Sequence, residues 1–107
     1  MQYRSFGKLD WQVSALGFGC MRLPIIGESS AQINQEKTGE MIRHAIDAGV
    51  NYFDTAYVYH EGNSEGALGK ALQGGYREKV RIATKLPVFN VEATSDFDRM
   101  LDEQLRR

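Results

Sequence analysis

The chain has 107 residues, of which 42% are hydrophobic and 25% charged, a composition typical of one ordinary globular domain. Its 13 basic and 14 acidic side chains leave a net charge of −1, which excludes the positive field of a nucleic-acid-binding domain. A single cysteine excludes an internal disulfide. The first ten residues lack the features of a signal peptide, and no apolar run approaches the ~20 residues of a membrane span, so we expect a cytoplasmic protein without a membrane partner.

The first twenty residues predict a hairpin followed by a strand. Residues 3–6 and 12–14 have an extended character, and the residues 7–10 between them (GKLD) are typical of a turn. The run 15–20 is short, apolar and rich in glycine, which favours a strand buried on both faces.

A helix is predicted next, from a cap at Asn34 to a stop at Gly49. Apolar residues recur along one of its faces, namely Met41, Ile42, Ala45 and Ile46. Residues 50–55 (VNYFDT) then form a second predicted strand, which is rich in β-branched and aromatic residues. One acidic residue, Asp54, stands near its carboxyl end.

A polar loop over residues 57–63 leads into a second predicted helix that opens at Ser64 and ends at the glycines 74–75. One face of this helix is apolar and carries Ala67, Leu68, Ala71 and Leu72. A third strand follows over residues 79–85, with Val80 and Ile82 facing one way. The last predicted helix begins near Ser95, and its apolar residues recur at helical spacing, namely Phe97, Met100, Leu101 and Leu105.

The alternation predicts one α/β domain over residues 1–107, with a hairpin over 1–14 and three βα units over 15–107. An open layered sheet and a closed barrel both begin in this way. A complete (βα)8 barrel needs ~250 residues, so the chain would hold about three-eighths of one. The last helix lacks a stop signal, which we interpret as a truncation or a fragment. We expect such a chain to need further residues, a partner or self-association through its unpaired sheet edge.

Three polar residues lie where the strands of a parallel sheet end, which is the edge that gathers reactive groups. Asp54 ends the second strand, Lys85 ends the third, and Tyr59 follows in the loop. Neighbouring strands are ~4.8 Å apart, so Asp54 and Lys85 are expected to pair. A cation beside a phenol lowers its pKa from the usual value near 10, which suits proton donation to a developing alkoxide. The alternative is a structural ion pair beside an ordinary loop tyrosine.

Three motifs resemble those of the aldo-keto reductase family. Residues 51–59 (NYFDTAYVY), followed by 62–65 (GNSE), are similar to its signature of Phe-Asp-Thr-Ala, then Tyr, then Gly-x-Ser-Glu. Residues 82–85 (IATK) resemble its Thr-Lys motif on the third strand, and residues 3–8 and 13–22 resemble its amino-terminal hairpin and first strand. The resemblance extends over nearly the whole chain.

The resemblance implies the amino-terminal part of a (βα)8 TIM barrel, a nicotinamide cofactor, usually NADPH, and a tetrad of Asp, Tyr, Lys and His. Asp54, Tyr59 and Lys85 match the first three, whereas the family's histidine ends a fourth strand that lies beyond residue 107. The implied reaction is hydride transfer from NADPH to a small carbonyl substrate, with Tyr59 as general acid, and we expect these 107 residues alone to be inactive. The alternative is a non-catalytic half-barrel for binding or assembly, or a nicotinamide-sensing regulatory subunit.

The implied cofactor contacts are Asp54 and the loop of Gly19, Cys20, Met21 and Arg22. Cys20 is also interpreted as a small buried hydrophobe. His60 adjoins Tyr59, which raises the alternative that it substitutes for the missing histidine, but neighbours on an extended loop tend to point apart. The two histidines have no partners at ligand spacing, so no metal site is predicted. Residues 20–24 and 59–65 further resemble a branch whose longer members often carry a carboxyl-terminal iron-sulfur segment.

Overall fold

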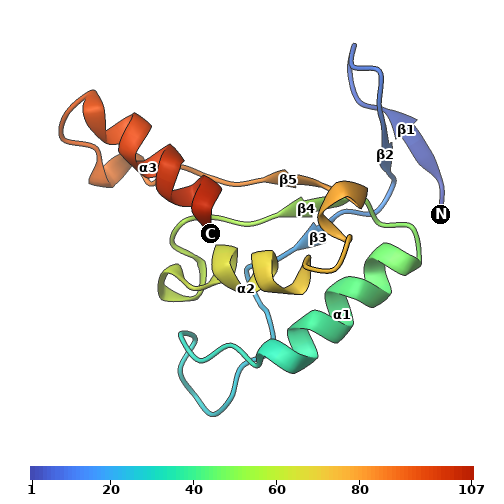
Figure 1. The fold of residues 1–107 in the computed structure, drawn as a ribbon, viewed down its shortest axis with the longest axis horizontal. Coiled ribbons are helices and arrows are strands. Elements are labelled where there is room, and N and C mark those ends of the chain that lie inside the picture. Colours follow the sequence, from blue (N-terminus) through green and yellow to red (C-terminus); the bar gives the residue numbers. More distant parts are fainter.

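The computed structural model describes all 107 residues. Two strands form a hairpin, three further strands alternate with helices, and α3 follows the last of them (Figure 1). The strands are β1 (Tyr3–Ser5), β2 (Gln12–Ser14), β3 (Phe18–Gly19), β4 (Tyr52–Asp54) and β5 (Arg81–Ala83). The helices are α1 (Gln35–Asp47), α2 (Ser64–Ala71) and α3 (Ser95–Arg106), with single 3-10 turns at Tyr59–Gly62, Arg77–Lys79 and Val88–Asn90.

The central sheet is parallel and has the strand order β3-β4-β5, which confirms the predicted α/β class. Its register places Gly19 opposite Asp54, and Asp54 opposite Ala83. The three strands therefore end at one level, and the segments that follow them all leave from the carboxyl end of the sheet. β3 and β5 are edge strands, so the sheet does not close on itself.

The hydrophobic core lies between the sheet and the helices α1 and α2, which Figure 1 shows on the same side of the sheet. Phe53 of β4 is fully buried and stacks on Phe18 of β3, with ring centroids 5.2 Å apart. Ile42 and Ile46 from α1 belong to the same core, as do the predicted apolar residues of α2, which are Ala67, Leu68, Ala71 and Leu72. Burial of such side chains supplies the main free energy of folding.

Helix α1 begins where the sequence predicts, because the side chain of Asn34 accepts a hydrogen bond from the backbone amide of Lys37 (3.1 Å). The predicted apolar face is only partly correct. Ile42 and Ile46 are buried, whereas Met41 is exposed, so the buried face is narrower than the periodicity indicates.

The hairpin is joined to the sheet by specific contacts at its base. Asn51 accepts a hydrogen bond from the Ser14 amide (2.8 Å) and donates one to the Gln12 carbonyl (2.9 Å). Tyr3 donates to the carbonyl of Gly49 (3.0 Å). Gly49 has a φ of +100°, which a side chain rarely allows.

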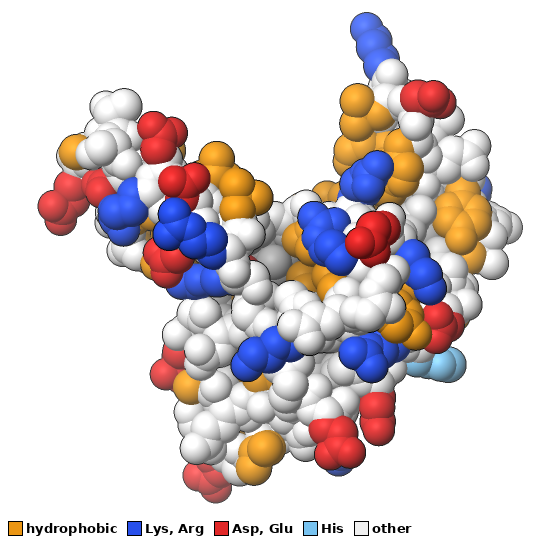
Figure 2. Space-filling model, viewed as in Figure 1, with side chains coloured by type: hydrophobic (Ala, Val, Ile, Leu, Met, Phe, Trp, Pro, Cys, Tyr) orange, Lys and Arg blue, Asp and Glu red, His pale blue; other side chains and the backbone are white.

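Helix α3 differs most from the sequence prediction. Its periodic apolar residues do not form a buried face, because only Met100 is buried and three others are exposed, namely Phe97, Leu101 and Leu105. Figure 2 shows a hollow between the hairpin and α3, with hydrophobic side chains on both of its sides. Spacing predicted the helix correctly, but it cannot tell which neighbour covers a helix face.

Two further corrections concern local structure. The segment predicted as a polar loop contains a 3-10 turn over Tyr59–Gly62, in which His60 and Glu61 have left-handed backbone angles. The third strand is shorter than predicted, since it runs over Arg81–Ala83 and is preceded by a 3-10 turn at Arg77–Lys79.

Candidate active site

Asp54, Tyr59 and Lys85 come together at the carboxyl ends of β4 and β5. The Lys85 ammonium donates a hydrogen bond to Asp54 Oδ1 at 2.5 Å and another to the Thr55 carbonyl at 2.8 Å. It also lies 4.7 Å from the centroid of the Tyr59 ring, a cation-π distance. The structure thus brings the three predicted residues together on one edge of the sheet.

The backbone keeps the residues after β4 and β5 paired beyond the strands themselves. The amide of Thr55 donates to the carbonyl of Ala83 (2.9 Å), and the amide of Tyr57 donates to that of Lys85 (3.3 Å). Ser64, at the start of α2, is fully buried and donates to the carbonyl of Cys20 (3.1 Å). These bonds hold the segments that carry the three residues against each other, and they hold the end of β3 against the start of α2.

The electrostatic environment keeps Lys85 positively charged. Its hydrogen bond to Asp54 raises the pKa of the ammonium, partial burial opposes this change, and Tyr59 acts in the same direction as Asp54. The side chains of Lys85 and Asp54 are 50% and 43% exposed, so the pair is accessible to a ligand. An ion pair at such exposure contributes little to the stability of the fold.

A comparison with protein families identifies the chain. The family model described as "Aldo/keto reductase family" matches residues 15–107. The chain belongs to the aldo-keto reductase family. Its (βα)8 barrel fold explains the alternation of strands and helices, and the chain supplies the hairpin and three βα units of such a barrel, with no closure.

Individual relatives agree with this assignment. "Probable aldo-keto reductase 1" from Glycine max is 39% identical over 82 residues, which are 77% of this chain and 23% of that protein. An aldo-keto reductase from Bacillus halodurans, solved in its holo form, matches 99% of this chain and 36% of its own with a TM-score of 0.77 and 30% identity. One from Klebsiella pneumoniae in complex with NADPH matches 89% of this chain and 31% of its own, with a TM-score of 0.69 and 25% identity. The chain thus spans about a quarter to just over a third of these relatives.

The loop after β3, where the family resemblance implies cofactor contacts, divides into exposed and buried residues. Gly19, Met21 and Arg22 are exposed, and Arg22 takes part in no ion pair. Cys20 is fully buried, and burial raises the pKa of its thiol to about 12, with a smaller contribution from Asp54. The Cys20 side chain therefore packs in the core, which was one of its two predicted interpretations.

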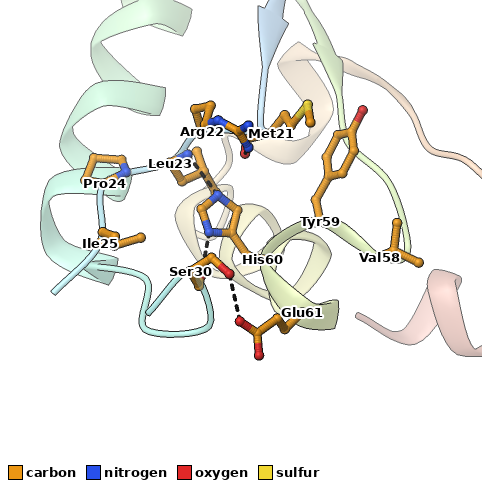
Figure 3. Close-up of a pocket in the computed structure, with 10 residues that line it drawn as sticks. All are labelled: Met21, Arg22, Leu23, Pro24, Ile25, Ser30, Val58, Tyr59, His60 and Glu61. Atoms are coloured by element: carbon orange, nitrogen blue, oxygen red, sulfur yellow. Dashed lines mark hydrogen bonds between the residues drawn. The ribbon is translucent and has the colours of Figure 1, made fainter. Parts of the chain in front are cut away.

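A cavity of about 740 Å³ opens between the loop after β3 and the turn after β4 (Figure 3). It is lined by Met21, Arg22, Leu23, Pro24, Ile25, Ser30, Val58, Tyr59, His60 and Glu61. Tyr59 thus borders both Lys85 and an open volume that is large enough for a small molecule.

His60 does not act as a substitute for the tetrad histidine. The residue is 8% exposed, and its ring points away from Tyr59 (Figure 3). Its two nitrogens are both engaged, since Nε2 accepts from the Leu23 amide (3.0 Å) and Nδ1 donates to the Ser30 carbonyl (2.7 Å). Such a ring has no free nitrogen with which to exchange a proton with a substrate.

Sequence reasoning missed a cluster of polar residues centred on Glu65. This carboxylate is 5% exposed, pairs with Arg107 (2.9 Å) and accepts hydrogen bonds from Gln104 (2.7 Å) and Thr84. An acidic residue in the first turn of a helix is normally explained by the helix dipole, so its position gave no signal of burial.

None of the helices combines the length and hydropathy that a membrane span needs.

Proposed function

We propose that the gene product is an oxidoreductase that reduces a small carbonyl compound with NADPH, with Tyr59 as the general acid. The observation that carries this proposal is the position of the Lys85 ammonium, 2.5 Å from Asp54 Oδ1 and 4.7 Å from the Tyr59 ring centroid. Membership of the aldo-keto reductase family and the NADPH-bound relative from Klebsiella pneumoniae support it.

Each of the three residues has a distinct task. Tyr59 donates its phenolic proton to the carbonyl oxygen as negative charge develops there. Lys85 stabilises the phenolate that remains, because a cation close to a phenol favours its ionised form. Asp54 holds the ammonium in place through the hydrogen bond and keeps it protonated.

The residues at the end of β3 fit the nicotinamide end of the cofactor. A Cβ atom at Gly19 would meet no atom within 4 Å, so open space lies above this backbone and a flat ring can approach it. Asp54 lies opposite Gly19 on the next strand, and Arg22 offers an exposed guanidinium for an anionic group. Bound NADPH supplies the hydride for the carbonyl carbon.

Substitution of Tyr59 tests the acid role, with Tyr57 as the matched control. Tyr59→Phe removes the proton donor and little binding surface, so we expect kcat of the full-length gene product to fall by about 10²–10⁴-fold with NADPH affinity unchanged. Tyr57→Phe loses a hydrogen bond to Glu103 instead and should retain turnover. Turnover of Tyr59→Phe within about threefold of the parent would contradict the assignment.

Substitution of Lys85 tests the role of the ammonium. Lys85→Met removes the cation that lies 4.7 Å from the Tyr59 ring centroid. We expect kcat of the full-length gene product to fall by about 10²-fold or more, because the phenolate that forms on proton transfer loses its stabilising charge. A kcat within about threefold of the parent would show that the ammonium does not assist the general acid.

A second candidate function is a non-catalytic half-barrel for binding or assembly, or a nicotinamide-sensing subunit. The edge strand β5 and the exposed apolar residues of α3, Phe97 and Leu105, favour it. Titration of the full-length gene product with NADPH, followed by energy transfer from Trp11, separates the candidates. A saturable signal without turnover indicates a sensor, no signal indicates an assembly module, and a saturable signal with turnover indicates the reductase.

A further inference from the structure

The turn between β4 and α2 holds two adjacent residues in an unfavourable backbone conformation. His60 has a φ of 54° and Glu61 a φ of 55°, and neither is a glycine. Side chains crowd the backbone in this left-handed region, so two consecutive examples persist only where neighbouring contacts hold them. The contacts of these two residues show what that restraint is.

Both residues are bound to the loop after β3. The Leu23 amide donates to His60 Nε2 (3.0 Å), His60 Nδ1 donates to the Ser30 carbonyl (2.7 Å), and the Ser30 hydroxyl donates to Glu61 Oε1 (2.8 Å) (Figure 3). Because an amide only donates, Nε2 carries no proton, and because a carbonyl only accepts, Nδ1 carries one. The ring is therefore neutral and its tautomer is fixed by two backbone groups.

These bonds join the two walls of the cavity. Every residue that lines it belongs either to the segment 21–30 or to the segment 58–61. Leu23 and Ser30 lie near the two ends of the first segment, and His60 is the immediate neighbour of Tyr59. A single buried ring thus fixes one wall against the other, on the same turn that carries the proposed general acid.

We propose that His60 is a positioning residue, which sets the width of this cavity and the direction of Tyr59 by holding the loop after β3 in the neutral, Nδ1-protonated form. The proposal rests on the proposed function only in that the cavity receives the carbonyl compound. Without the restraint, the left-handed turn relaxes and the wall formed by Leu23 moves. The substrate then binds less well and Tyr59 is less well aligned with the carbonyl oxygen.

The first test uses the full-length gene product and needs no substrate. Nitrogen NMR of the His60 ring, at about pH 8 to keep free imidazoles neutral, should show a proton on Nδ1 and none on Nε2. A proton on Nε2 would overturn the proposal, because the Leu23 amide would then have no acceptor.

Two variants of His60 separate its bonds. His60→Asn tolerates the left-handed backbone and keeps a donor for Ser30, but it is too short to reach Leu23. His60→Gln extends an amide oxygen to the position of Nε2 and keeps the acceptor. We expect exchange of the Leu23 amide to accelerate about tenfold in His60→Asn and to stay within about threefold in His60→Gln. His44→Gln, an exposed histidine on α1, is the control and should leave Leu23 unchanged. Unchanged exchange in His60→Asn would overturn the proposal.

The last test measures kinetics of the full-length gene product with 4-nitrobenzaldehyde and NADPH. We expect His60→Asn to raise KM about fivefold or more, with recovery in His60→Gln, because alignment and binding both depend on the loop. A residue that only stabilises the fold would lower the active fraction and leave KM unchanged. An unchanged KM despite faster Leu23 exchange would overturn the proposal. Absence of turnover in the parent would instead defeat the proposed function, while the Leu23 amide still reports on His60.

Discussion

Removal of the Arg107 guanidinium should weaken the attachment of α3 to the rest of the fold. Arg107 pairs with Glu65 at 2.9 Å, bonds to Glu103 and to the Gly62 carbonyl (3.3 Å), and lies 4.2 Å from the centroid of the Tyr57 ring. Arg107→Gln keeps much of the side chain's volume but leaves the buried carboxylate without its counter-charge. Only Met100 among the apolar residues of α3 is buried, so polar contacts such as this pair and the Gln104–Glu65 bond carry much of the attachment of the helix.

The magnitude follows from the burial of the pair. Loss of one partner from a fully buried ion pair costs about 3–5 kcal/mol. Arg107 is 22% exposed and Glu65 keeps its bonds from Gln104 and Thr84, so water and these donors offset part of that cost. We therefore expect a loss of about 2 kcal/mol in the free energy of unfolding, close to that of one charged hydrogen bond.

Urea unfolding followed by circular dichroism measures this loss. For a domain of this size the slope is about 1–3 kcal/mol per molar urea, so the midpoint should fall by about 1 M. Arg106→Gln is the matched control, because it removes the same charge from the same helix end at an exposed side chain that forms no ion pair. Midpoints of the two variants that agree within about 0.3 M would refute the reasoning, since dipole and charge effects alone would then explain both.

Three further predictions concern single groups. The Cys20 thiol, with a pKa raised to about 12 by burial, should react with a thiol reagent only after unfolding, and fast reaction of the native chain would contradict its burial. Bonds from Arg99 and two backbone amides lower the pKa of Asp96 to about 2, so this carboxylate stabilises the start of α3 above pH 4 and loses that effect as the pH falls towards 2. Asp96→Asn should remove this contribution, so amide exchange at the start of α3 should depend less on pH between 4 and 2, and an unchanged dependence would contradict the role of Asp96. Asn51→Ala should lower the free energy of unfolding by about 1–2 kcal/mol and loosen the hairpin, which faster exchange of the Ser14 amide would report. Unchanged exchange would show that other contacts hold the hairpin.

The sequence predicts the order of helices and strands because the spacing of apolar residues along each element reflects the face that it buries. The apolar faces of α1 and α2 cover the sheet, and Phe53 of its central strand belongs to the same core as Ile42 and Leu68. Asn34 marks the start of α1 through its capping bond. The convergence of Asp54 and Lys85 was also predictable, because parallel strands of equal register end at the same edge.

Other features depend on contacts that no local pattern encodes. The left-handed turn at His60 and Glu61 forms because distant backbone groups at Leu23 and Ser30 bind it. Glu65 is buried because residues from α3 reach it, although its place in the first turn of α2 is typical of an exposed acid. The exposure of Phe97 likewise depends on which elements surround α3. A periodic pattern predicts that a helix has an apolar face, but it does not say which element packs against that face.

The amino terminus is fixed against the turn between α1 and β4. A Cβ atom at Gly49 would come within 2.8 Å of both the Met1 Cβ atom and the Tyr3 hydroxyl oxygen, so the first residues occupy the space that a side chain would fill. An affinity tag fused directly before Met1 therefore begins next to this contact, although Met1 itself is half exposed. Such a tag should follow a flexible spacer if the hairpin is to keep its contacts with Gly49.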